Sequence, residues 1–216
     1  MIRLNITTEG QTEEEFVSRI LAPHLANFGK QVTARSLRTS DGHRGGYSNF
    51  DKVKRDVEQW LKEEPGAWHT TLLDLYGLNA KFPGYEAAKH LPPYQKVARV
   101  EQAFGEHINF WRFFPFVQLH ELETLLYAEP DVMQQVLGMY RRLPANHFAG
   151  ILAECGAPEL INDSRETAPS KRILQLCPNY DKITEGLLIL EEIGLERIRQ
   201  QCPHFNEWVT RLEQLT

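Results

Sequence analysis

The chain has 216 residues, of which 42% are apolar, and it carries 24 Lys and Arg against 29 Asp and Glu, a formal net charge of -5. This apolar fraction is enough for a buried core, and the length fits one α/β domain with a helical extension. The negative charge argues against a uniformly basic surface. Nucleic acid would therefore have to bind to a local patch or through metal ions.

The cysteines and the N-terminus favour a cytoplasmic protein. Cys155, Cys177 and Cys202 are scattered, which indicates reduced thiols rather than a disulfide framework or a structural zinc site. The N-terminus lacks a basic segment followed by an apolar run, and no apolar run approaches the ~20 residues that cross a bilayer. We therefore expect neither a secretory signal nor a membrane segment.

The first part of the chain predicts two strands, each followed by a helix. Residues 2–7 alternate between apolar and polar side chains and predict a strand, and residues 31–37 predict a second. Thr12 and Glu15 form a capping box that starts the first helix, and Pro23 predicts a kink or a restart within it. The second helix carries an apolar stripe made of Phe50, Val53, Val57, Trp60 and Leu61.

The middle of the chain continues the alternation of strands and helices. Residues 69–74 predict a short strand, residues 78–93 a loop rich in Pro and Gly, and residues 94–108 a helix. Residues 112–119 predict a fourth strand, in which Pro115 favours an edge position or a bulge. This order indicates an α/β fold with a mainly parallel four-stranded sheet flanked by helices.

The C-terminal third predicts helices and no further strand. Helical segments separated by Pro and Gly follow residue 130, and the last of them, residues 205–215, has one apolar face. We expect residues 1–128 to form the α/β core. Residues 129–216 are expected to form a helical C-terminal region that packs on this core as part of a single compact unit.

Acidic side chains follow three of the predicted strands. They are Glu9 and Glu13 after the first strand, Asp74 at the end of the third, and Glu121 and Glu123 after the fourth. The carboxyl ends of parallel strands meet at one edge of a sheet, so these groups are expected to converge. Clustered carboxylates repel each other, and a hard cation such as Mg²⁺ or Mn²⁺ removes the conflict. Two such ions would support phosphoryl transfer.

The acids near the first and third strands also have structural interpretations. Glu9 and Glu13 would each interact favourably with the positive N-terminal end of a helix. Asp74 suits a turn before Gly77. Spacing alone does not choose between these interpretations and a metal site.

The run His120-Glu121-Leu-Glu123 has its own alternatives. Its two glutamates would point apart on a regular helix, so both can face one ion only on a turn or a strand end. His120 could be an ordinary histidine at a helix start. Thr124 stands where the zinc motif H-E-x-x-H has its second histidine, which argues against a zinc hydrolase.

Several segments together resemble DUF4276, a bacterial Toprim-like family, over nearly the whole chain. They are Glu-Gly-Gln-Thr-Glu at 9–13, Leu-Asp-Leu-Tyr-Gly at 73–77, Phe-Pro-Gly at 82–84, Gln-Leu-His-Glu-Leu-Glu at 118–123, Ile-Asn-Asp at 161–163 and Glu-Thr-Ala-Pro-Ser-Lys-Arg at 166–172. The resemblance implies a Toprim-like, Rossmann-like fold that is distantly similar to the Toprim domains of OLD-type nucleases. In that wider group, a glutamate after the first strand and a D-x-D motif after the third bind divalent metal.

The resemblance assigns roles to single residues. Glu9 and Asp74 match two of the metal-binding positions, whereas Tyr76 stands where the second acid of D-x-D would be. The tyrosine removes one metal ligand, although its hydroxyl could still contact a phosphate or a water. This substitution leaves open whether the site binds metal without catalysing a reaction.

The OLD-type nucleases add further positions to the pattern. Their second catalytic glutamate is matched by Glu13, and their later acids could be supplied by Glu121 or Glu123. They also use a downstream lysine, for which Lys171 is the candidate. The alternative for Lys171 is a solvated charge at a helix start.

A local excess of basic residues suggests where a substrate could bind. Residues 30–56 contain seven Lys or Arg and three Asp, a net charge of +4. The glycine-rich loop in this stretch could bring His43 and Arg44 to a phosphate group. A solvated loop and a charged helix face are the alternative.

Other residues are weaker candidates for substrate contact. Tyr76 and His120 lie beside the predicted acids. Lys81, Phe82 and Tyr85 could supply a backbone contact and base stacking.

Two classes of function follow. The first is a Mg²⁺- or Mn²⁺-dependent nuclease in bacterial defence that acts on DNA or RNA with a partner ATPase of the AAA or ABC type. The partner is implied by the resemblance, because the chain has no G-x-x-x-x-G-K-[ST] motif. The second class is a non-catalytic binding module that docks through an exposed apolar face of the C-terminal helix. A nucleotide phosphoesterase shares the metal chemistry, and a homodimer is compatible with the sequence.

Overall fold

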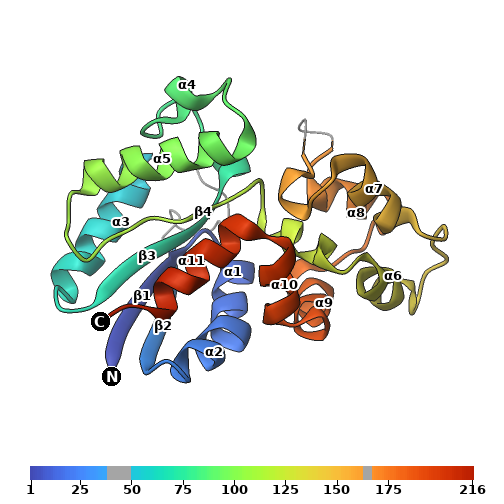
Figure 1. Cartoon of the computed structure of the whole chain (residues 1–216), viewed down its shortest axis with the longest axis horizontal. Coiled ribbons are helices and arrows are strands. Elements are labelled where there is room, and N and C mark those ends of the chain that lie inside the picture. The colour runs from blue at the N-terminus through green and yellow to red at the C-terminus, as the bar shows by residue number, and fades with distance from the viewer. Residues whose placement is uncertain (38–49, 163–166) are drawn as a thin grey trace. The chain divides into compact units, whose positions relative to one another are not determined.

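The computed structural model describes residues 1–37, 50–162 and 167–216 (Figure 1). The first half contains β1 (Ile2–Thr8), α1 (Gln11–Phe16), α2 (Ala22–Ala26), β2 (Lys30–Ser36), α3 (Phe50–Glu63), β3 (Trp68–Asp74), α4 (Tyr85–Ala88), α5 (Pro93–Ile108) and β4 (Val117–Gln118). The second half contains α6 (Pro130–Gly138), α7 (His147–Cys155), α8 (Pro169–Leu176), α9 (Leu187–Ile193), α10 (Leu195–Gln201) and α11 (Pro203–Glu213).

Four parallel strands form the sheet, in the order β2-β1-β3-β4. Leu4 of the central strand β1 pairs with Val32 of β2 and with Trp68 of β3, and Asp74 of β3 pairs with Gln118 of β4. Helices α3 and α5 cover one face of this sheet, and α1 and α2 cover the other (Figure 1). The predicted α/β class and the mainly parallel four-stranded sheet flanked by helices are therefore confirmed.

The predicted apolar stripes lie in the core. All five stripe residues of α3 are buried, as are Leu4 and Ile6 of β1 and Leu72 and Leu73 of β3. The apolar residues of α11, namely Phe205, Trp208, Val209 and Leu212, are buried as well, with exposed fractions of 4% or less. The expected exposed docking face on the C-terminal helix is therefore wrong, because this face is part of the protein core.

The first helix begins earlier than its predicted capping box. Gly10 is the N-cap, and the Glu13 carboxylate, not that of Glu15, accepts the hydrogen bond from the N-cap N–H. Further along, a π-helical turn over Val17–Leu21 precedes Pro23 in the first turn of α2. Proline has no N–H to donate, so the helix restarts there as predicted.

The fourth strand is shorter than predicted. It spans Val117–Gln118, with an isolated bridge between His69 and Phe113. Pro115 lies between these two pairings and cannot donate to a ladder. Next to it, the Thr71 hydroxyl acts as donor and acceptor in place of a main-chain partner. It donates to the Phe116 carbonyl (2.8 Å) and accepts from the Phe116 N–H (3.0 Å). A side chain thus replaces part of the expected strand pairing.

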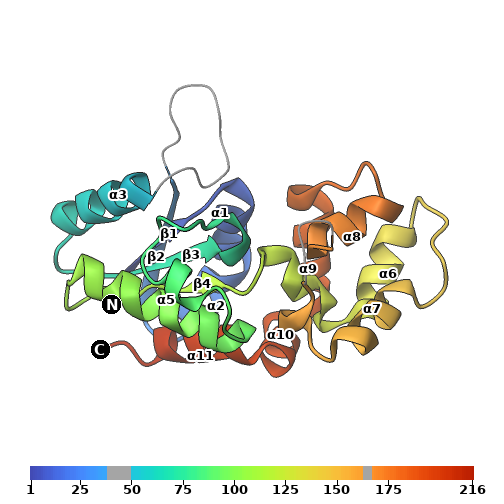
Figure 2. The same cartoon turned by 90° about the horizontal axis from the view of Figure 1, so that it is seen from above.

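The chain divides into two compact units. The first comprises residues 1–118 and 210–216, and the second comprises residues 119–209. The division thus falls after Gln118, whereas we expected the core to end at residue 128. The described part of the second unit contains helices and short helical turns without a strand, with α6 to α9 visible in Figure 2. Among the described residues, none of the helices is long and apolar enough to cross a bilayer.

The last residues of the chain belong to the first unit. The buried Lys30 ammonium donates to the Leu215 carbonyl (2.5 Å), and His24 contacts the Glu213 carboxylate at 2.6 Å. The indole N–H of Trp68 donates to the Thr216 carbonyl (3.2 Å). These contacts fasten the end of the chain to strands β2 and β3 and to helix α2.

Candidate functional site

The carboxyl ends of β1 and β3 bring Glu9 and Asp74 together. The N–H of Glu9 donates to the carbonyl of Leu72 (3.1 Å), and the N–H of Asp74 donates to the Glu9 carboxylate (3.1 Å). Both residues are half-buried. The side chain of one strand end thus binds the main chain of the next, which fixes two predicted metal-binding acids at one end of the sheet.

Glu13 lies one turn further on but makes a structural contact. Its carboxylate accepts a hydrogen bond from the Gly10 N–H (2.9 Å) at the start of α1, and the residue is buried. This N–H belongs to the helix end that has no intrahelical acceptor. One carboxylate oxygen of Glu13 is therefore used to cap the helix that follows Glu9.

An acidic cleft of about 330 Å³ lies beside the pair. Its lining residues are Glu9, Gly10, Gln11, Glu14, Glu15, Ser36 and Leu37. The carboxylate of Glu14 accepts a hydrogen bond from the Ser36 N–H at the end of β2 (3.2 Å). Three glutamates around one cleft repel phosphate groups, so an anionic substrate could bind here only together with cations.

The acid pair fits Mg²⁺ or Mn²⁺ as a partial ligand set. Among the described residues, no group of three or more His, Cys, Asp and Glu is arranged to hold a metal ion. Mg²⁺ often uses only one or two carboxylates, with water and substrate phosphates as its other ligands. The oxygen chemistry of Glu9 and Asp74 meets that requirement, whereas zinc sites use three or four protein ligands.

Tyr76 lies at the same end of the sheet, on the short helical turn Leu75–Gly77 that follows β3. Its side chain is 38% exposed. The residue two positions after Asp74 thus exposes a hydroxyl to solvent, which can contact a phosphate or a water but cannot supply a carboxylate.

A second acidic cluster belongs to the second unit. His120 has a φ of 66°, a left-handed conformation that is rare for residues other than glycine, and Glu121 is extended. The Lys182 ammonium lies 2.6 Å from the Glu123 carboxylate and 4.0 Å from that of Glu121. Both acids are buried. The turn therefore lets both carboxylates face one cation, and in this structure that cation is Lys182.

The first of these acids also caps a helix. Glu121 accepts hydrogen bonds from the N–H (2.5 Å) and the hydroxyl (3.0 Å) of Ser170 at the start of α8. Lys171, the lysine named from the sequence, is the next residue and is exposed. Sequence reasoning missed Lys182, which reaches the acids from a turn that carries no motif.

Burial controls the protonation of this cluster. It raises the pKa of Glu123 to about 7, against the opposing effect of the nearby Lys182 ammonium, and the negative charge of Glu121 adds to the increase. Burial thus favours the neutral form of the Glu123 carboxyl, whereas the Lys182 ammonium favours the charged form.

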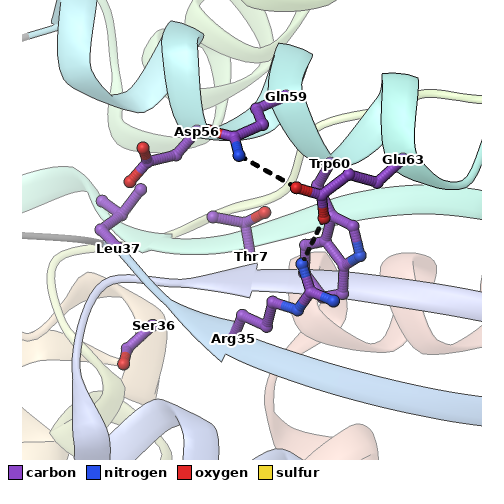
Figure 3. A pocket seen from close by; sticks show the side chains of 8 residues that line it. All are labelled: Thr7, Arg35, Ser36, Leu37, Asp56, Gln59, Trp60 and Glu63. Carbon is purple, nitrogen blue, oxygen red and sulfur yellow. Dashed lines mark hydrogen bonds and ion pairs between the residues drawn. The ribbon is translucent and has the colours of Figure 1, made fainter.

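The basic stretch between residues 30 and 56 is partly used for internal contacts. The Arg35 guanidinium lies 4.3 Å from the Trp60 ring centre and pairs with Glu63 at 2.8 Å (Figure 3). Gln59 donates to the same carboxylate (2.9 Å). The pocket that these residues line has a volume of about 30 Å³, room for one water. Arg35 is therefore neutralised by an ion pair.

Other predicted substrate contacts fall in different environments. His43 and Arg44 lie outside the described residues. Phe82 is 2% exposed and its ring contacts Phe50 and Phe104 edge-on, so its predicted role in base stacking is wrong. The phenylalanine of the Phe-Pro-Gly segment is thus part of the core.

Comparison with known proteins gives a family and a group of solved structures. The model of the family described as "Domain of unknown function (DUF4276)" matches residues 8–213. The C-terminal region of the Burkholderia pseudomallei OLD protein is similar over 99% of this chain and 99% of that chain, with 15% identity and a TM-score of 0.48. The C-terminal region of the Xanthomonas campestris pv. campestris OLD protein, phased with iodine, is similar over 98% and 97%, with 17% identity and a TM-score of 0.39. No curated protein matches the chain.

Proposed function

The chain belongs to the DUF4276 family, and we propose that it is a divalent-metal-dependent nuclease that hydrolyses phosphodiester bonds. The observation that carries the proposal is the contact between Glu9 and the main chain of Asp74. It joins two acids that match Toprim metal-binding positions at the carboxyl ends of adjacent parallel strands. This edge of an open α/β sheet is where ligands bind in many such folds.

In this proposal, Glu9 and Asp74 hold Mg²⁺ or Mn²⁺. When bound, such an ion lowers the pKa of a water and neutralises charge on a phosphate. Glu9 is oriented by the Asp74 N–H, and Glu13 holds the start of α1 beside it. Glu9 or Glu13 would accept the proton of the attacking water. Glu121 and Glu123 are engaged by Lys182 and Ser170, and the proposal does not depend on them.

We also propose that an ATPase domain or subunit works with this one. The only support is the resemblance of the motifs to OLD-type systems, and the sequence itself contains no P-loop motif. The acid pair would then supply the hydrolytic chemistry, and the ATPase would control access to nucleic acid.

A cleavage assay tests the proposal. Labelled DNA and RNA are incubated with the protein in Mn²⁺, in Mg²⁺ and in EDTA. We expect cleavage in either metal, none in EDTA, and a loss of at least about 100-fold in Glu9→Gln and Asp74→Asn, because each substitution removes a charged ligand. Glu106→Gln is the control, since Glu106 is exposed on α5 and its carboxylate contacts only Gln102 among the described residues. Full activity in both site variants would overturn the assignment.

Tyr76 favours a second candidate, a Toprim-like binding module without catalysis. Its hydroxyl replaces a carboxylate, so the ligand set beside Asp74 is one acid short of the D-x-D pattern. Calorimetric titration with Mg²⁺ and Mn²⁺ separates the two candidates. Metal binding that is lost in Glu9→Gln supports the enzyme, and no heat of binding at millimolar metal supports the module.

A further inference from the structure

A group of aromatic and basic side chains, two of them exposed and two half-buried, lies at the opposite end of β3 from Asp74. It consists of Arg3, Trp68, Trp111 and Arg112 in the first unit, here named the Trp111 surface. Trp111 is 71% exposed, and its ring centre lies 6.1 Å from that of Trp68 at an interplanar angle of 64°. The Arg112 guanidinium lies 4.3 Å from the ring centre of Trp111 and 5.9 Å from that of Trp68.

The charge of this surface is positive. Arg112 donates to the neutral carbonyl of Gly66, and among the described residues it forms no ion pair with a carboxylate. Arg3 reaches the same turn, with its guanidinium 3.8 Å from the point where a Cβ on Gly66 would lie. Arg3 pairs with Glu64 at 3.1 Å, and its side chain remains 54% exposed. Two guanidinium groups, of which one pairs with an acidic side chain, thus lie at this turn in a chain of net charge -5.

Packing does not account for Trp111. An indole that is 71% exposed contributes little to the burial of apolar surface, whereas the ring centre of the neighbouring Trp68 lies 6.2 Å from that of the buried Phe114. The Arg112 guanidinium lies over the Trp111 ring, where a cation–π interaction is favourable. The result is an aromatic ring presented to solvent next to a positive charge.

We propose that the Trp111 surface binds single-stranded nucleic acid, with a base stacked on Trp111 and phosphates paired with Arg112 and Arg3. Bases have π-faces that stack on aromatic rings, and guanidinium groups pair with phosphate oxygens. In a duplex the bases are stacked inside the helix, so unpaired nucleotides are the form that fits. The choice of nucleic acid rests on the proposed function, whereas the site itself is new, because it lies about 20 Å from Asp74 at ~3.3 Å per residue of β3.

Fluorescence anisotropy with labelled oligonucleotides of about 20 nucleotides, oligo-dT and oligo-U, tests the proposal on the full chain in EDTA. Trp111→Ala is expected to raise Kd about 10-fold, because one stacked base is lost, and Trp111→Phe is expected to retain most of the affinity. Arg112→Gln is expected to lower the slope of log Kd against log salt by about 0.7. Tyr140→Ala is the control, because Tyr140 is an aromatic residue that is 91% exposed in the second unit.

Several results would overturn the proposal: no binding by the wild type, an unchanged Kd in Trp111→Ala, or an equal loss in Tyr140→Ala. If Trp111→Ala instead changes the mass measured by light scattering and leaves nucleic-acid binding intact, the surface binds a second copy of the chain. Because EDTA prevents metal-dependent cleavage, binding is measured separately from activity. Cleavage that survives in Glu9→Gln would therefore refute the proposed function without affecting this result.

Discussion

Glu13 has a structural and a catalytic interpretation that substitution can separate. Its carboxylate accepts the Gly10 N–H that starts α1. We expect Glu13→Ala to lower the free energy of unfolding by about 1 kcal/mol, because this N–H loses its acceptor. Glu13→Gln keeps an oxygen acceptor and should unfold at nearly the wild-type urea concentration. Urea denaturation and the cleavage assay measure the two effects on the same variants.

Comparison of the Glu13 variants assigns the role. If Glu13 accepts a proton in the reaction, Glu13→Gln loses cleavage at unchanged stability, and if it only caps the helix, both properties are retained. Glu15→Ala is the stability control on the same helix, because the Glu15 side chain makes no hydrogen bond among the described residues. A Glu13→Ala protein as stable as the wild type would contradict the capping role.

The sequence predicts the location of a single side chain where that location follows from the residue's position relative to a strand. Glu9 and Asp74 follow β1 and β3, and the parallel pairing of these strands places them together. The contact between Lys182 and Glu123 could not be predicted, because it joins two turns that meet only through tertiary packing. The same holds for the choice of Glu13 over Glu15 as the helix cap.

Whole elements were predictable where one periodic pattern dominates. The apolar spacing of the sequence predicts the buried stripe of α3 and the helix α5. This spacing is a reliable signal because a helix must bury its apolar face. The length of β4 did not follow from residue type, because the Thr71 hydroxyl replaces main-chain pairing at Phe116. The β-propensity of a residue type is an average over many strands, so it does not include one particular side-chain contact.

Gly84 fixes the approach of α4 to α5. It has a φ of 77°, and a Cβ there would lie 2.8 Å from both the Ala103 Cβ and the Arg99 carbonyl oxygen. We expect Gly84→Ala to lower the free energy of unfolding by about 2 kcal/mol more than Gly29→Ala, since overpacking adds to the cost of positive φ. Gly29 is a matched control in the same unit, with a φ of 72° and nothing within 4 Å of the point where its Cβ would lie. Equal losses in both variants would show that close packing at Gly84 has no energetic effect.

At the scale of the whole molecule, the first unit is discontinuous in sequence. Residues 210–216 belong to it, although residues 119–209 form a separate unit. Local sequence patterns cannot predict that the last residues belong to the first unit. The contacts that place them there, such as that between Lys30 and Leu215, join residues far apart in sequence. The buried face of α11 could be predicted as apolar, but its place in the core could not.

Leu212 tests whether the end of the chain stabilises the first unit. It is fully buried, so Leu212→Ala is expected to lower the free energy of unfolding by about 2–4 kcal/mol through lost burial and a cavity. Hydrogen exchange measured by mass spectrometry should then speed up in β1, β2 and β3. Leu188→Ala is the control, because Leu188 is 37% exposed on α9 and its truncation should cost less than about 0.5 kcal/mol. If exchange in Leu212→Ala accelerates only between residues 119 and 209, the last residues do not stabilise the sheet that carries Glu9 and Asp74.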